Sequence, residues 1–263
     1  MKAGRVLVRG SGDVGSAVCH RLRLAGYPVI LQDDPQPAHT RRGMAFVDAL
    51  YEGQATLEGV LAKRARDLDD LEAMLACGRA IPATDEPLAA IVSRLRPVAI
   101  VDGVVRKHGA ADPIRGAAPL TIGLGPGHEA GVTADRVIET ARGEDLGRVL
   151  ACGKSRAYDG KPAEIAGHGR DRFVACPEDG LFRTGGRIGL RVAAGDLLGH
   201  VGARPIVAPF AGVLRGLCHD GAWLAAGARV AEIDASGSPE NAFGLGERPQ
   251  RIAAGVLEAL VDD

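Results

Sequence analysis

Along the first 130 residues, short apolar runs alternate with segments whose apolar residues recur at helical spacing. Strands are expected at residues 5–9, 29–31, 57–62, 79–83, 98–101 and 120–124. Helices are expected between them, at residues 14–24, 67–77 and 86–95. This alternation predicts a Rossmann-like, doubly wound parallel sheet over residues 1–130, with ligands bound beyond the carboxyl ends of its strands.

A glycine-rich turn joins the first strand to the first helix in the pattern G-x-G-x-x-G. In nucleotide-binding units such glycines permit a tight turn, close approach of a phosphate and close helix packing, and an acid after the second strand binds a ribose hydroxyl. The corresponding residues here are Gly10, Gly12, Asp13, Gly15, Asp33 and Asp34. The alternative is a turn retained only for helix packing.

Further polar residues follow other strands of the predicted sheet and point to an anion site at the same edge. They are Arg41, Arg42, Asp102, Arg106, Lys107, Gly125, Gly127 and His128. Arginine suits bidentate contact with phosphate. Each basic pair alone is also typical of a solvated surface, and His128 has no visible catalytic partner, so the sequence leaves catalysis undecided.

Residues 131–172 are expected to form a helix and a linker. Thr133 can cap a helix over Ala134–Ala141. The segment 153–172 is rich in glycine and charge, and its Lys154, Lys161 and His168 either cover a site or lie on a solvated linker.

A repeat with an offset of about 32 residues marks the C-terminal half. Pro177 and Gly195 of the first copy correspond to Pro209 and Gly227 of the second. The pattern predicts two interlocked β-sheets over residues 173–236, similar to a biotinyl/lipoyl-type barrel-sandwich hybrid. Because no lysine follows Lys161, neither lipoate nor biotin is expected. Residues 237–263 are expected to be a linker and a docking helix at 251–260.

Composition limits the remaining possibilities. The formal net charge is −1, which argues against nucleic-acid binding. The sequence has no run of 18 apolar residues, so no membrane association is expected. Five widely spaced cysteines without a C-x-x-C pair predict reduced thiols in the cytoplasm, without a disulfide framework or a metal site.

Longer motifs carry a family resemblance along nearly the whole chain. They are R-R-x-M-A-F-x-D-A-x-Y-E-G at 41–53, I-G-L-G-P-G at 122–127, V-I-E-T at 137–140, L-G-R-V at 146–149 and A-G-V-L-E-A at 254–259. The chain resembles the YqeB-type accessory proteins of selenium-dependent molybdenum hydroxylase systems. The resemblance implies a role in maturing a xanthine dehydrogenase-like client enzyme, near its molybdopterin cofactor or the terminal chalcogen ligand. The bound cofactor is left open, with a molybdopterin nucleotide or dinucleotide as the candidate.

Three hypotheses for the function remain. The first is a maturation factor that holds a nucleotide-bearing molybdopterin or its precursor. The second is an NAD(P)-dependent oxidoreductase of unknown substrate, and the third is a noncatalytic adaptor. The sequence leaves homo-oligomerisation open.

Overall fold

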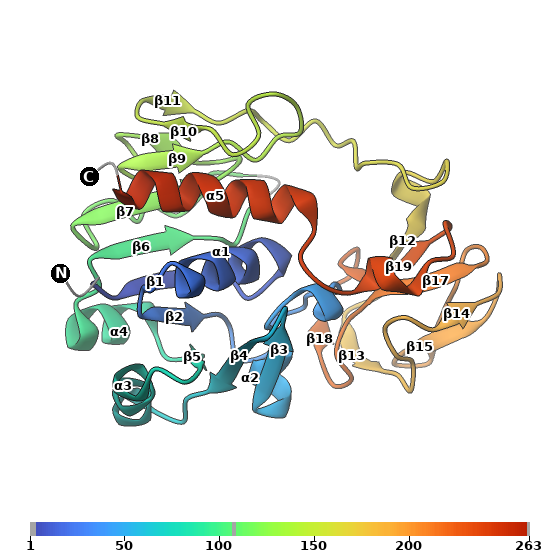
Figure 1. Ribbon diagram of the computed structural model, residues 1–263. Helices are drawn as coiled ribbons and strands as arrows, with labels where there is room; N and C mark the ends of the chain where they lie inside the picture. The colour runs from blue at the N-terminus through green and yellow to red at the C-terminus, as the bar shows by residue number, and fades with distance from the viewer. Residues whose placement is uncertain (1–3, 107–108, 262–263) are drawn as a thin grey trace.

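A nine-stranded mixed sheet organises the computed structural model, which describes residues 4–106 and 109–261 (Figure 1). Its strands lie in the order β10 (Val149–Leu150), β9 (Arg136–Ile138), β7 (Leu120–Leu124), β6 (Ala99–Asp102), β1 (Val6–Arg9), β2 (Val29–Gln32), β5 (Ile81–Thr84), β4 (Val60–Arg64) and β3 (Gln54–Leu57). From β9 to β4 the strands run parallel. The two edge strands, β10 and β3, run antiparallel to their neighbours.

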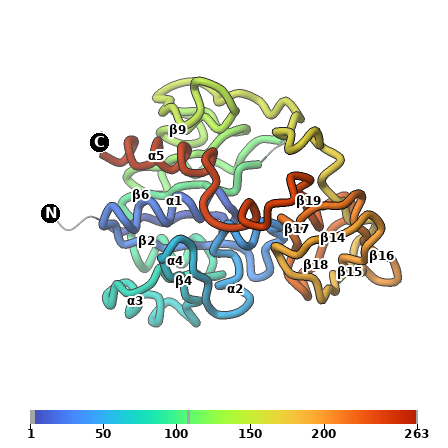
Figure 2. The backbone as a smooth tube through the Cα atoms, turned by 45° about the vertical axis from the view of Figure 1, so that its right-hand side comes forward, coloured from blue at the N-terminus to red at the C-terminus, as the bar shows by residue number. Residues whose placement is uncertain are grey.

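Helices cover both faces of this sheet. They are α1 (Asp13–Leu24), α2 (Asp48–Glu52), α3 (Leu68–Cys77), α4 (Leu88–Leu95) and α5 (Glu247–Val261). On one face, residues of α1 and α5 share a buried core with Val6 and Val8 of β1. On the other face, Leu71 of α3 and Ile91 of α4 pack against Leu7. Figure 2 shows α5, the last helix in the chain, lying alongside α1, the first.

The C-terminal half forms two four-stranded antiparallel sheets around a second core. One has the order β12 (Phe173–Ala175), β19 (Arg229–Asp234), β17 (Gly212–Leu217) and β14 (Arg191–Val192). The other has the order β16 (Arg204–Val207), β15 (Leu197–Val201), β13 (Gly180–Arg183) and β18 (Trp223–Leu224). A separate two-stranded sheet pairs β11 (Gly153–Lys154) with β8 (Glu129–Ala130). Single turns of 3-10 helix occupy 42–44, 170–172 and 239–242.

The 32-residue repeat reappears in the positions of these strands. β13, β14 and β15 start at residues 180, 191 and 197, and β17, β18 and β19 start 32 residues later, at 212, 223 and 229. Strand β14 pairs with β17 of the other copy, and β18 pairs with β13. The two copies therefore exchange a short strand.

The predicted fold class, a Rossmann-like doubly wound parallel sheet followed by a barrel-sandwich hybrid, is wrong. The large sheet is mixed, with antiparallel strands at both edges, and several small antiparallel sheets accompany it. One cause is the expected strand at 57–62, which is a hairpin. Glu58 and Gly59 both have positive φ angles, 45° and 77°, and this turn adds β3 antiparallel to β4.

The expected helix at Ala134–Ala141 is also wrong. Its central residues form β9 beside β7, with Val137 and Ile138 fully buried. Both side chains are β-branched, which lowers helix propensity and favours a buried strand. Pairing with the sheet decides the conformation here.

In the described part of the chain, no helix combines the length and apolar character that a membrane-spanning segment requires.

Candidate functional site

The glycine turn predicted to cradle a phosphate is tightly packed. A Cβ atom at Gly15 would lie 1.9 Å from the carbonyl oxygen of Gly10, and one at Gly103 would lie 2.8 Å from that of Arg9. Gly10 itself has a φ angle of 92°. These glycines let β1, α1 and the segment after β6 approach one another, so helix packing accounts for Gly10 and Gly15. At Gly12, an added Cβ would meet the ring of His39 at 3.1 Å.

Asp33, the expected ribose ligand, is engaged within the protein. Its Oδ2 accepts hydrogen bonds from the Ser11 backbone N–H at 2.5 Å and the Ser11 hydroxyl at 2.7 Å. His39 Nε2 lies 3.0 Å from the same oxygen. Burial alone would raise the pKa of Asp33, but His39 and Ser11 outweigh it and hold the pKa below its usual value. The neighbouring Asp34 is exposed.

His128 does have a partner, and the partner is Asp102. His128 Nε2 lies 3.3 Å from Asp102 Oδ2, and Nδ1 lies 3.2 Å from the hydroxyl of Thr133. Arg9 and Arg106 flank the same carboxylate at 3.6 and 3.4 Å. The side chains of His128 and Asp102 are only 3% and 1% exposed. This buried pair therefore fixes the loop after β7 against the end of β6.

Two glycines of that loop make room for its packing. A Cβ at Gly123 would lie 2.3 Å from the His128 ring, and one at Gly125 would lie 2.2 Å from the hydroxyl of Thr140. Gly127 has a φ angle of 90° and packs on the backbone of residues 109–111. The structure thus brings the predicted residues of this loop, Gly125, Gly127 and His128, close to Asp102, where they pack the loop against its neighbours.

Arg41 joins the edge of the large sheet to the C-terminal half. Its Nη1 donates to Asp13 at 2.9 Å, and its Nε and Nη2 donate to the two oxygens of Glu232 at 2.9 and 3.1 Å. Arg172 also donates to Glu232, and Arg215 Nε lies 3.7 Å from it. We call Asp13, Arg41, Arg172, Arg215 and Glu232 the Glu232 cluster.

Glu232 is fully buried within this cluster. Burial alone would raise the pKa of Glu232, but Arg41, Arg172 and Arg215 outweigh it and hold the pKa below its usual value. Arg41 acts similarly on Asp13, whose pKa is also lowered against the effect of burial. The cluster therefore depends on ionised carboxylates.

We expect the protein to lose stability in acid. A carboxyl group whose pKa is depressed by folding stabilises the native state fully above its unfolded pKa, near 4, and loses this contribution as the pH falls through the folded pKa. The lowered pKa values of Asp13, Asp33, Asp102 and Glu232 all act in this direction. Melting temperature measured from pH 7 downward should be nearly flat to about pH 5 and then fall. A melting temperature that stays constant to about pH 3 would contradict this account.

The other predicted basic residues are already paired. Arg42 Nε donates to Asp48 at 2.7 Å and so faces α2, away from the Glu232 cluster. Arg106 donates to Asp112 at 2.6 Å as well as facing Asp102. Lys107 lies outside the described residues. The charges of Arg41 and Arg106 thus have partners within the chain.

A metal-like arrangement occurs at α2. Donor atoms of Asp48, Glu52 and His219 lie within 4.8 Å of one another. The Arg42 guanidinium already occupies this acidic group, pairing with Asp48 and lying 4.0 Å from Glu52. A cation is thus supplied by the chain, and we assign no metal there.

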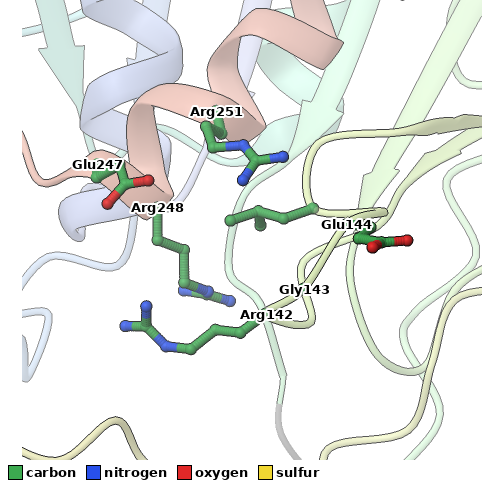
Figure 3. Close-up of a pocket in the computed structure, with 7 residues that line it drawn as sticks. Arg142, Gly143, Glu144, Glu247, Arg248 and Arg251 are labelled. Carbon is green, nitrogen blue, oxygen red and sulfur yellow. The ribbon is translucent and has the colours of Figure 1, made fainter.

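The sequence did not reveal a basic hollow beside this edge (Figure 3). Its volume is about 420 Å³, and its lining includes Arg142, Arg248 and Arg251 together with Glu144 and Glu247. Arg248 and Arg251 lie in the first turns of α5, where the helix dipole disfavours positive charge. Two arginines at the start of a helix, where positive charge is unfavourable, were the signal in the sequence that could have indicated this hollow.

Comparisons with known proteins locate the chain among its relatives. No family model matches it. It is 35% identical over 257 residues to the uncharacterized protein YqeB of Escherichia coli strain K12, across 97% of this chain. The YqeB-type resemblance is confirmed. The chain spans about half of that relative, 47% of its length.

Solved structures with similarity to this chain are distant. The ectoine utilization protein EutE (DoeB) from Ruegeria pomeroyi, in its apo form, is 14% identical, with 88% of this chain and 86% of that chain covered and a TM-score of 0.27. A succinylglutamatedesuccinylase/aspartoacylase from Rhodobacter sphaeroides is 20% identical over 39% of this chain and 29% of its own, with a TM-score of 0.22. At such scores neither carries an argument about function.

Proposed function

We propose that this protein is an accessory factor that holds an anionic cofactor, a nucleotide-bearing molybdopterin or its precursor, during maturation of a xanthine dehydrogenase-like molybdenum hydroxylase. One observation carries the proposal: basic side chains from distant segments gather at the carboxyl end of the parallel strands. Arg41, Arg142 and Arg248 come from the segments after β2, after β9 and at the start of α5. Parallel sheets bind ligands at this end.

The molybdenum context rests on the motifs shared with YqeB-type proteins. The likeness extends over 97% of this chain, so it includes both the large sheet and the C-terminal half. The C-terminal half, which lacks a lysine for lipoate or biotin, would then contact the client enzyme.

The oxidoreductase alternative requires a proton-transfer group that reaches the nicotinamide. The sequence offered His128 for this role. That side chain is 3% exposed and contacts Asp102 and Thr133. Its burial favours the accessory role over hydride transfer.

Deletion of the gene should lower the specific activity of the molybdenum hydroxylase without lowering the amount of its polypeptide. The reason is that an enzyme deprived of its cofactor still folds into a detectable chain. Enzyme assays and immunoblots of the same extracts measure the two quantities, and re-expression of the intact gene should restore activity. Full client activity in the deletion strain, with NAD-dependent turnover by the pure protein, would instead support the oxidoreductase.

A further inference from the structure

The basic hollow contains arginines that form no close ion pair with the described residues. Among the described residues, Arg142, Arg248 and Arg251 form no ion pair within 4.0 Å, although Glu144 and Glu247 also line the hollow. By contrast, Arg41, Arg42 and Arg106 all pair with carboxylates. Unpaired guanidinium groups in a concave site are suited to an external anion.

The three arginines line the same hollow. Arg142 comes from the loop after β9, and Arg248 and Arg251 come from α5; Figure 3 shows Arg142 and Arg248 extending toward each other. Arg248 Nε donates to the carbonyl oxygen of Thr140 at 2.9 Å, which anchors its side chain. Its Nη1 and Nη2 groups have no hydrogen-bond partner among the described residues and stay available to a ligand.

Arg248 has other guanidinium groups close to it. Burial is the main cause that lowers the pKa of Arg248; Asp13 and Glu139 oppose it, and the neighbouring Arg142 and Arg41 lower the pKa further. A bound anion would relieve this repulsion between guanidinium groups. The first turn of α5 adds the positive end of a helix dipole at the same place.

We propose that this hollow binds a diphosphate group, with Arg142, Arg248 and Arg251 as its ligands. One carboxylate would leave at least two of the three guanidinium groups uncompensated, whereas a diphosphate offers several oxygens and more than one negative charge. A volume of about 420 Å³ accommodates a group of this size. That the diphosphate belongs to a nucleotide-bearing cofactor rests on the proposed function; binding of diphosphate itself does not.

Calorimetric titration of inorganic pyrophosphate into the full chain tests the site. We expect saturable binding that is tighter than the binding of orthophosphate. Arg142→Gln and Arg251→Gln should each weaken it roughly tenfold, because each removes charge-assisted hydrogen bonds to the anion. Both side chains are exposed and unpaired, so the variants should melt as the parent does, and this is checked first.

Arg79→Gln is the matched control. Arg79 is also exposed, but it precedes β5 and so lies at the opposite, amino end of the parallel strands. The Arg79→Gln variant should bind pyrophosphate as tightly as the parent protein does. Equal binding of orthophosphate and pyrophosphate, or equal weakening by Arg79→Gln and Arg142→Gln, would overturn the proposal.

ADP competition distinguishes a nucleotide from free diphosphate as the ligand. Comparison with the deletion assay distinguishes failure of this site from failure of the maturation role. Competition by ADP would place the diphosphate on a nucleotide, whereas pyrophosphate that ADP does not displace would identify free diphosphate as the ligand; either supports the site. If pyrophosphate does not bind, the proposed diphosphate site is refuted. The maturation role is then still decided by the activity of the client enzyme in the deletion strain. Pyrophosphate binding in a protein whose deletion leaves the client fully active refutes only the maturation role.

Discussion

Replacing Glu232 by alanine is expected to lower the free energy of unfolding by about 3–5 kcal/mol, the cost typical of removing one partner from a buried ion pair. The side chain is fully buried and accepts hydrogen bonds from Arg41 and Arg172. Its loss leaves the Arg172 guanidinium, 3% exposed, without the one carboxylate that pairs with it among the described residues. Urea unfolding followed by circular dichroism measures the difference.

Two further variants make this result specific. Glu232→Gln keeps the size of the side chain but removes its charge, so it should also destabilise the protein and reduce the loss of stability in acid. Glu178→Ala removes an exposed acid of the same half of the chain and should change the free energy by less than about 0.5 kcal/mol. If Glu232→Ala costs no more than Glu178→Ala, the cluster does not stabilise the fold.

Gly15→Ala is the second substitution for which we expect a large effect, a loss of about 3 kcal/mol. Helix propensity alone predicts a gain of about 1 kcal/mol, since Gly15 lies inside α1. The added methyl group would, however, lie 1.9 Å from the carbonyl oxygen of Gly10. Because that neighbour is backbone, α1 must move away from β1, and the packing cost exceeds the gain in propensity.

Gly185→Ala provides the control for this prediction. Gly185 is exposed, and an added Cβ would meet no atom within 4 Å. The melting temperature of the Gly185→Ala variant should stay close to that of the parent protein. A Gly15→Ala protein that is more stable than the parent would show that propensity outweighs the contact.

Local pattern was sufficient to predict the elements that lie next to each other in the chain. The glycine turn with its flanking strand and helix, the helix at Leu68–Cys77 and the strand at Leu120–Leu124 all occur in the structure. The failures are at Glu58–Gly59 and Val137–Ile138, where a left-handed turn and pairing with β7 override the local pattern. Strands at and near the edges of the sheet are decided by tertiary pairing, which the periodicity of the sequence does not record.

The contacts of the site were harder to predict from the sequence, because they join residues that are far apart along the chain. Arg41 and Glu232 are 191 residues apart, and Arg172 and Glu232 are 60 apart. Neither Arg41, in a basic pair, nor Glu232, one of two acids in β19, gave a sign in the sequence that they would meet. The same distance explains why Arg41 was expected to be free for a phosphate, whereas the unpaired Arg142 and Arg248 were missed.

The packing of α5 against α1 has a consequence for the order of events during synthesis. Ile252, Val256 and Ala259 of α5 complete the core that α1 begins at Val14 and Val18. A growing chain that has emerged only as far as β19 therefore exposes the apolar surface of α1 that α5 will cover. Nascent chains of this protein should accordingly be clients of ribosome-associated chaperones until the residues of α5 have been released.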